Sequence, residues 1–164
     1  MTHRRVQLLE PSFTGVAVLG FLAAVSGGAL AADTAARSPA PAGWQKVLAR
    51  KGGCAMSVPA DWKVDPLIKG SAGLVDNSAS AVVSLADSVN TLAEVKPVMQ
   101  GMFKPTKTFE DSAHRLWYEY QNAGGPHWYV GVPVKGGICG AQISFKPGKE
   151  EDVAKKVAAS VGPG

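Results

Sequence analysis

The chain has 164 residues, of which 17 are Lys or Arg and 13 are Asp or Glu, so its formal net charge is +4. These basic residues are scattered, with no run of five or six, whereas a nucleic-acid surface is typically a clustered basic stripe. We therefore expect no nucleic-acid partner. The length suits one domain with one core, which leaves a small binding protein and a small enzyme as the classes to separate.

An export signal is predicted over residues 1–31. Residues 3–5, His-Arg-Arg, form a basic start, and residues 16–30 form an apolar stretch without charge. That stretch has the length of a signal-peptide core and falls short of the roughly 20 residues of a membrane-spanning helix. Residues 29–31, Ala-Leu-Ala, match the cleavage pattern of a signal peptide. Cleavage predicts a periplasmic or secreted protein with no stable membrane insertion; the alternative is an uncleaved N-terminal anchor.

A short leader separates the predicted cleavage site from the domain. Residues 32–43 are small, carry prolines and include no large apolar side chain, which predicts a flexible segment. The single globular domain is then expected over residues 44–164, beginning at Trp44.

Short strands dominate the predicted domain. The run 80–86 is β-branched and apolar, which indicates a strand buried on both faces. Residues 123–126, Ala-Gly-Gly-Pro, read as a hairpin loop that places Asn122 opposite His127. The strands predicted from such patterns span residues 45–49, 54–58, 62–64, 80–86, 108–111, 115–121, 127–134 and 138–145.

Two helices are predicted, one in mid-chain and one near the C-terminus. Within residues 91–103, Thr91 and Glu94 have capping-box form, but Pro97 suits this helix only if the helix starts later or kinks. The second helix is expected over about residues 149–161, with acidic residues in its first turn. The order of elements predicts an α+β domain, an antiparallel β-sheet with a mid-chain and a C-terminal helix packed on it.

This arrangement resembles the PsbP-like α/β sandwich family over about residues 44–161. The resemblance rests on the N-terminal strand, Val-Pro-x-x-Trp at 58–62, the mid-chain helix, the long hairpin and the helix after Phe-Lys-Pro at 145–147. That family includes the photosystem II extrinsic subunit, a nuclear import factor and many bacterial exported proteins. The resemblance implies a binding or assembly role without catalysis, and no metal-binding or catalytic residue of the family carries over to this sequence.

The two cysteines, Cys54 and Cys139, predict one structural disulfide, because the chain carries an export signal and lacks a C-x-x-C redox motif. Bridged Cα atoms lie within about 7 Å of each other. The first and the last core strand are therefore expected close together, in or beside one sheet. The alternative is a soft copper(I) site formed by both cysteines and Met56.

No catalytic residue, metal site or cofactor is predicted. No serine lies in a Gly-x-Ser-x-Gly motif, and the glycine pairs lack the spacing of a nucleotide-binding loop. Glu110 and Asp111 are neighbours on a strand and therefore point to opposite faces. His114 and His127 are expected about 27 Å apart along the hairpin, at roughly 3.4 Å per residue.

The aromatic hairpin is the remaining candidate for a site. Strand alternation places the odd-numbered residues of 116–121 on one face and the even-numbered residues on the other. Aromatic side chains mixed with polar ones suit a binding surface, and the alternative is packing within the core. The candidate binding surface consists of Trp117, Glu119, Gln121 and Trp128.

These patterns predict an exported, non-enzymatic binding or accessory protein whose partner is another protein, docked through the hairpin. The alternative is a small periplasmic hydrolase or a metal-handling protein. A pocket that collects His114 or His127 with carboxylates would favour the alternative, and a flat aromatic patch would favour the binding protein.

Overall fold

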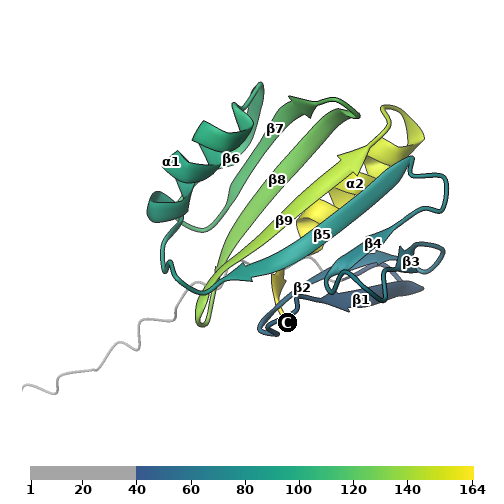
Figure 1. Cartoon of the computed structure of the whole chain (residues 1–164), viewed down its shortest axis with the longest axis horizontal. Coiled ribbons are helices and arrows are strands. Elements are labelled where there is room, and N and C mark those ends of the chain that lie inside the picture. The colour runs from purple at the N-terminus through teal and green to yellow at the C-terminus, as the bar shows by residue number, and fades with distance from the viewer. Residues whose placement is uncertain (1–39) are drawn as a thin grey trace, which may run out of the picture. The chain divides into compact units, whose positions relative to one another are not determined.

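The computed structural model describes residues 40–164, which form ten strands and two helices (Figure 1). The predicted signal peptide, residues 1–31, lies outside the described residues, as does most of the predicted leader. The last leader residues end in a turn, in which the Trp44 N–H donates to the Pro41 carbonyl at 3.2 Å. Neither helix in the described part of the chain is long and apolar enough to cross a membrane.

Seven strands form the larger sheet, in the order β3–β4–β5–β9–β8–β7–β6, and all neighbours in it are antiparallel. The long strands β7, β8 and β9 form the meander that the sequence predicts, and β5 pairs with the outer side of β9. The strands are β3 (Lys63–Val64), β4 (Ser71–Gly73), β5 (Ala79–Ala86), β6 (Lys107–Asp111), β7 (Leu116–Asn122), β8 (Gly125–Val134) and β9 (Gly137–Phe145).

A second, three-stranded sheet has the order β1–β2–β10 and is also antiparallel. Its strands are β1 (Trp44–Leu48), β2 (Cys54–Pro59) and β10 (Gly162–Pro163). Residues 54–58 of β2 are all buried, because β2 lies against the C-terminal helix α2 (Lys149–Ser160) and against β5 and β9. The α+β class is confirmed, with two sheets where one was expected.

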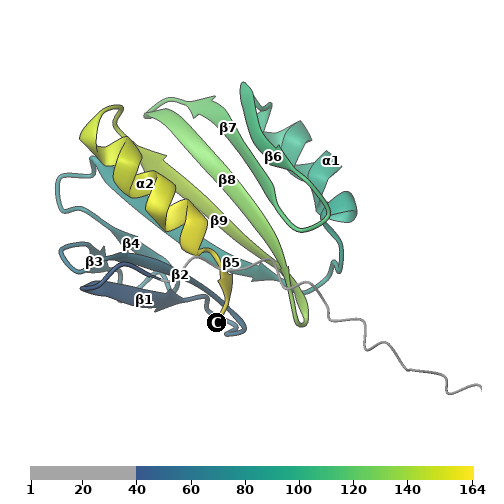
Figure 2. The same ribbon diagram turned by 180° about the vertical axis from the view of Figure 1, so that it is seen from behind.

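The main core lies between the larger sheet, the small sheet and α2, and Figure 2 shows α2 in front of the larger sheet, beside β9. Small side chains let α2 approach the sheet closely, because Ala154 and Ala158 are fully buried beside Val157. Ser160 fastens the end of this helix to the small sheet. Its hydroxyl accepts from the Ser57 N–H at 2.8 Å, and its single proton is directed at the Val157 carbonyl at 2.7 Å, with the Ser57 carbonyl at 3.2 Å.

A second apolar cluster lies under α1 (Leu92–Phe103), on the opposite face of the larger sheet. Thr91 caps this helix, accepting from the Glu94 N–H at 3.3 Å, so the predicted N-cap is confirmed. The Glu94 carboxylate accepts from the Asn90 N–H, rather than from the Thr91 N–H that would complete a capping box. Pro97 is tolerated inside the helix, which starts at Leu92. The cluster that α1 covers consists of Leu92, Val95, Leu116, Tyr118, Tyr120, Tyr129 and Ile138.

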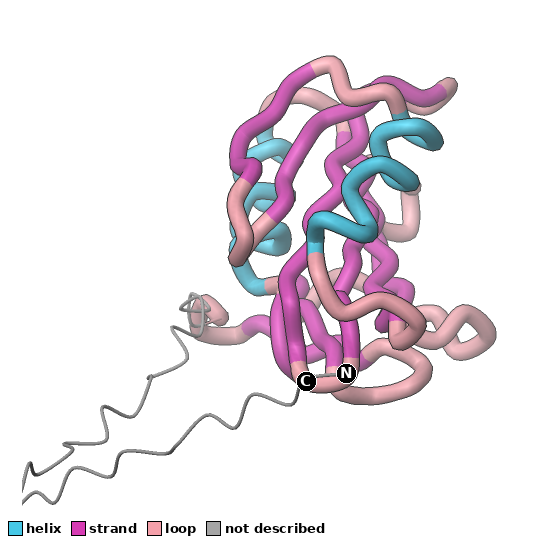
Figure 3. The backbone as a smooth tube through the Cα atoms, turned by 90° about the vertical axis from the view of Figure 1, so that its left-hand side faces the viewer, coloured by secondary structure: helices cyan, strands magenta, loops and turns pink. Residues whose placement is uncertain are grey.

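The two helices cover different parts of the two faces. Figure 3 shows them on opposite sides of the larger sheet, where α1 packs on β7 and β8 and α2 packs on β9. On the α1 side, β5 is therefore left open, and Val82 is 40% exposed. On the α2 side, β6 is left open, and Phe109 is 37% exposed. The expectation that β5 is buried on both faces is wrong, because neither of the two helices described covers its α1 side.

The predicted disulfide is confirmed between Cys54 on β2 and Cys139 on β9. Their Cα atoms are 5.3 Å apart, and the residues are separated by 85 positions in sequence. Because β2 belongs to the small sheet and β9 to the larger one, the bond joins the two sheets. It also encloses every strand from β3 to β8 and helix α1 in one covalent loop.

The hairpin turn is tighter than predicted. Asn122 pairs with Gly125, so that Tyr120, and not Asn122, faces His127. The loop is reduced to residues 123–124, because Gly125 and the following proline join the strand. This shift is an even number of positions, so the predicted faces of β7 are unchanged.

Candidate binding surface on strands β6, β7 and β8

The four predicted site residues lie on one face of the larger sheet, the face on which α2 packs. Trp117, Glu119 and Gln121 alternate along β7, and Trp128 lies opposite Glu119 on β8. The Trp128 indole N–H donates to the Glu119 carboxylate at 3.1 Å. Gln121 reaches the other oxygen of the same carboxylate at 3.5 Å. The structure therefore brings all four residues together.

Their exposure differs. Trp128 is 0% exposed, so it supports the surface from beneath and contributes no accessible ring. Its ring packs 4.4 Å from that of Phe145 and 5.4 Å from that of Trp117, measured between centroids. Trp117 and Glu119 are half-buried, and Gln121 is exposed. Packing within the core, one of the two interpretations of the hairpin, therefore applies to Trp128. Its neighbours on β7 reach the surface, as the other interpretation requires.

Phe109 completes this surface, and sequence reasoning missed it. The ring lies 5.0 Å from that of Trp117 and 5.4 Å from that of Trp128. A β-bulge between Thr108 and Glu110 inserts Phe109 into the edge strand β6 beside Trp117. The available signal was that Phe109 is the one large apolar residue in a polar strand. We call the set Phe109, Trp117, Glu119 and Gln121, with Trp128 beneath, the aromatic surface.

Two cations lie over the rings of the aromatic surface. The Lys107 ammonium is 4.7 Å from the Phe109 centroid, and the Arg115 guanidinium carbon is 5.6 Å from the Trp117 ring. Both distances are within the range of a cation–π attraction. The Trp117 indole N–H is buried and has no hydrogen-bond partner within residues 40–164. The rings are thus held by packing and by cations.

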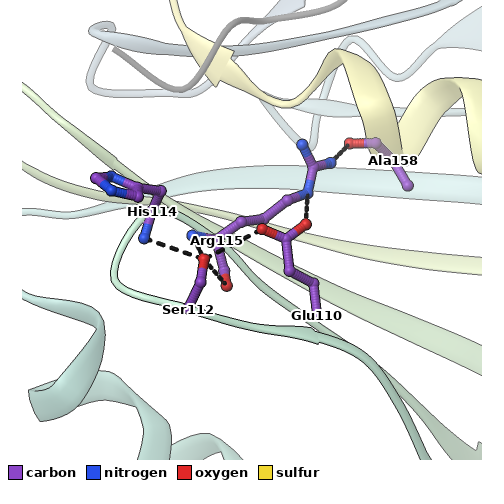
Figure 4. Close-up of polar contacts among 5 residues, drawn as sticks. All are labelled: Glu110, Ser112, His114, Arg115 and Ala158. Atoms are coloured by element: carbon purple, nitrogen blue, oxygen red, sulfur yellow. Dashed lines mark hydrogen bonds and ion pairs between the residues drawn. The ribbon is translucent and has the colours of Figure 1, made fainter. Parts of the chain in front are cut away.

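Arg115 connects the aromatic surface to the end of α2 (Figure 4). Its guanidinium donates to the Ala158 carbonyl in the last turn of α2, and its Nε lies 3.9 Å from the Glu110 carboxylate. Burial lowers the pKa of Arg115 and the nearby Glu110 charge opposes that change. A cation at a helix C-terminus is favoured by the helix dipole. Arg115 therefore holds β7 against α2 and remains charged.

Ser112 shapes the turn that delivers Arg115 (Figure 4). Its hydroxyl donates to the Glu110 carboxylate at 3.1 Å and accepts from the backbone N–H groups of His114 and Arg115 at 3.2 and 3.0 Å. His114 takes part through its backbone, and its side chain is exposed. The turn therefore serves to position Arg115 and Glu110.

The other histidine lies elsewhere. His127 is on β8 near the hairpin loop, where its Nδ1 lies 2.9 Å from the Gly125 carbonyl oxygen and its ring lies 5.3 Å from that of Tyr120. The structure does not bring it together with His114, which lies beyond the other end of β7. Within residues 40–164, no group of three or more His, Cys, Asp or Glu side chains could hold a metal ion.

Family models, curated proteins and solved structures each gave no match to this chain. The PsbP-like resemblance therefore stays a prediction from the sequence.

Proposed function

We propose that this chain is an exported, non-enzymatic binding or accessory protein that docks another protein on its aromatic surface. The observation that carries the proposal is the exposed Phe109 ring, 37% accessible, packed on Trp117 and braced by the buried Trp128. An aromatic side chain that is already fixed in place loses little conformational freedom when a partner covers it.

The residue types around Phe109 support this proposal. Protein interfaces are enriched in Trp, Phe and Arg at their centres and have polar rims. Here Phe109 and Trp117 form the centre, Arg115 lies against Trp117, and Glu119 and Gln121 form a polar border.

The edge strand next to the surface indicates how a partner docks. In the described part of the chain β6 has no neighbour on its outer side, but it carries Lys107, Glu110 and Asp111 and a β-bulge. Charges and bulges on an edge strand oppose the addition of another strand. We therefore expect the partner to contact side chains on the face of the sheet and not to extend the sheet.

The export part of the proposal rests on other features. The N-terminal pattern is that of a signal peptide, and the Cys54–Cys139 disulfide is typical of an oxidising compartment. The PsbP-like resemblance also points to binding and assembly. Within residues 40–164 no observation favours the alternative, a hydrolase or a metal-handling protein.

The test is a capture experiment from a periplasmic extract of the source cells, with purified protein as bait. Phe109→Asp places a charge at the centre of the aromatic surface, and Leu67→Asp is the matched control, because Leu67 is 90% exposed in a loop between β3 and β4. We expect a partner that Leu67→Asp retains and Phe109→Asp loses. Equal capture by both variants would show that the aromatic surface is not the docking site.

A further inference from the structure

We propose that the groove between α1 and strands β5 and β9 binds a small, neutral, largely apolar molecule that carries a hydrogen-bond-accepting oxygen. This site lies on the face of the larger sheet opposite to the aromatic surface and is independent of the protein-docking role. The groove has a volume of about 350 Å³, within the range of small-molecule sites.

The walls of the groove are apolar. Val95, Val98 and Met99 of α1 form one side, and Val82 and Ala86 of β5 contribute to the other. Val98 is 59% exposed and Val82 is 40% exposed, so apolar surface on both sides remains in contact with water. A ligand that covers these side chains gains about 25 cal/mol for each Å² of apolar surface it buries.

The floor carries a hydroxyl that nothing in the described chain satisfies. Tyr129 is 3% exposed and lines the groove, and its hydroxyl has no hydrogen-bond partner within residues 40–164. Two glycines make room for this side chain. A Cβ atom at either Gly131 or Gly140 would lie 3.2 Å from the Tyr129 hydroxyl oxygen. Because these two glycines have no side chain, the Tyr129 ring can lie against the sheet with its hydroxyl at the groove.

A second donor lies beside the first. The Gln142 side chain lines the groove, and its carbonyl oxygen accepts from the Tyr120 hydroxyl at 3.3 Å. This contact leaves the Gln142 NH₂ group as a donor. Burial raises the pKa of Tyr129 to about 12, so its hydroxyl keeps its proton at neutral pH. Two donors on the floor favour a ligand with an acceptor oxygen, such as a ketone, an ester or an amide.

The charges at the groove exclude an anionic ligand. Among residues 40–164, Glu94 is the one charged residue that lines the groove, and no lysine or arginine of that part of the chain lines it. The Glu94 carboxylate accepts from the Asn90 N–H at 3.2 Å and from the Thr91 hydroxyl at 2.9 Å. A fatty acid or a phosphate would find no cation here and would be repelled by Glu94. This charge pattern selects a neutral molecule.

The probe for the test is prodan, a neutral naphthalene ketone whose fluorescence reports on its surroundings. We expect saturable binding at one site on the purified protein. The anion anilinonaphthalene sulfonate, of similar size, should fail to displace it. Ser84→Trp fills the groove from the exposed side of β5 and should abolish binding, whereas Val75→Trp, in a loop outside the groove, should leave it intact.

A pair of tyrosine variants tests the chemistry of the floor. Tyr129→Phe keeps the ring and removes the donor, so prodan should bind about two- to tenfold more weakly, the range for one hydrogen bond. Tyr118→Phe is the control, because the Tyr118 hydroxyl is buried, unpartnered within residues 40–164 and outside the groove lining.

Three results would overturn this proposal. The first is unchanged prodan binding by Ser84→Trp, and the second is equal weakening by the two tyrosine variants. The third is a dimer that binds no prodan and that Ser84→Trp dissociates, which would assign the groove to a second copy of the chain. Each of these outcomes is independent of whether Phe109→Asp loses a protein partner.

Discussion

Trp128 and Glu119 face each other across the β7–β8 pair, and the indole N–H of the first donates to the carboxylate of the second at 3.1 Å. A fully buried indole thus meets a half-buried carboxylate at the boundary between core and surface. The pair marks the boundary between the core and the surface of the hairpin, because Trp128 is buried whereas its neighbours on β7 reach the surface.

Removing either member of this pair should destabilise the protein. Trp128→Ala should lower the free energy of unfolding by about 3–5 kcal/mol, as for other large core residues. Glu119→Ala should lower it by about 1–3 kcal/mol, because it leaves the indole donor without its charged acceptor. Urea unfolding followed by circular dichroism measures both. Gln121→Ala, at an exposed position, is the control and should change stability by less than about 0.5 kcal/mol.

The disulfide should be a major source of stability. A bond that spans 85 positions is expected to contribute about 4–5 kcal/mol by restricting the unfolded chain. The double variant with Cys54→Ser and Cys139→Ser should therefore unfold at a much lower urea concentration than the oxidised protein. Prodan binding by this variant is measured separately. A thiol assay on oxidised, denatured protein should find no free thiol. Two reactive thiols would contradict a structural bond.

Arg115 should be more important for stability than its position near the surface suggests. Arg115→Ala leaves the Ala158 carbonyl without its guanidinium donor and removes the contact with Glu110, at a cost of about 1–3 kcal/mol. Arg115→Lys keeps the charge but loses the planar group that reaches both partners, so we expect an intermediate effect. Thermal unfolding compares them. Lys107→Ala, which removes an exposed cation, should have little effect; an equal loss in that variant would contradict the anchoring role.

The tyrosines under α1 should make the fold sensitive to alkali. Burial raises the pKa of both Tyr120 and Tyr129 from 10.0 to about 12. An unfolded tyrosine ionises near pH 10, so the folded state binds these protons more tightly. The stability that results is fully present below about pH 10 and is lost as the pH rises towards about 12.

Urea midpoints measured across that pH range, together with phenolate absorbance, test this dependence. Tyr129→Phe removes one of the ionising groups, so its midpoint should fall less steeply with pH than that of the wild type. An identical slope in both proteins would show that Tyr129 ionises no differently in the folded and unfolded states.

Local patterns predicted much of this fold. The alternation on β7 correctly separates Trp117 from Tyr118, and Thr91 correctly marks the start of α1. The presence of two cysteines in a chain with an export signal correctly predicted the Cys54–Cys139 disulfide. These features depend on neighbouring residues or on a single pair, which a sequence displays directly.

Features that depend on long-range packing were missed. β10 (Gly162–Pro163) has no strand pattern and forms because β2 offers it a free edge. The run 54–58 is buried throughout, whereas 80–86, predicted to be buried on both faces, alternates between buried and more exposed residues. Both burial patterns depend on which faces of the sheets α1 and α2 cover. The local sequence pattern of a strand does not show where the helices pack. Phe109 was missed for a similar reason, since its role depends on a bulge.

That bulge lies in the last strand of the sheet. An extra residue inside a central strand would shift every pairing beyond it by one and exchange the two faces. In β6 the extra residue shifts nothing further, because no strand in the described sheet follows it. Insertions and deletions at positions near Phe109 can therefore alter the outline of the aromatic surface while the register of β7, β8 and β9, and with it the groove on the opposite face, stays the same. The sequence of the aromatic surface can therefore change in evolution without a change in the groove on the other face of the sheet.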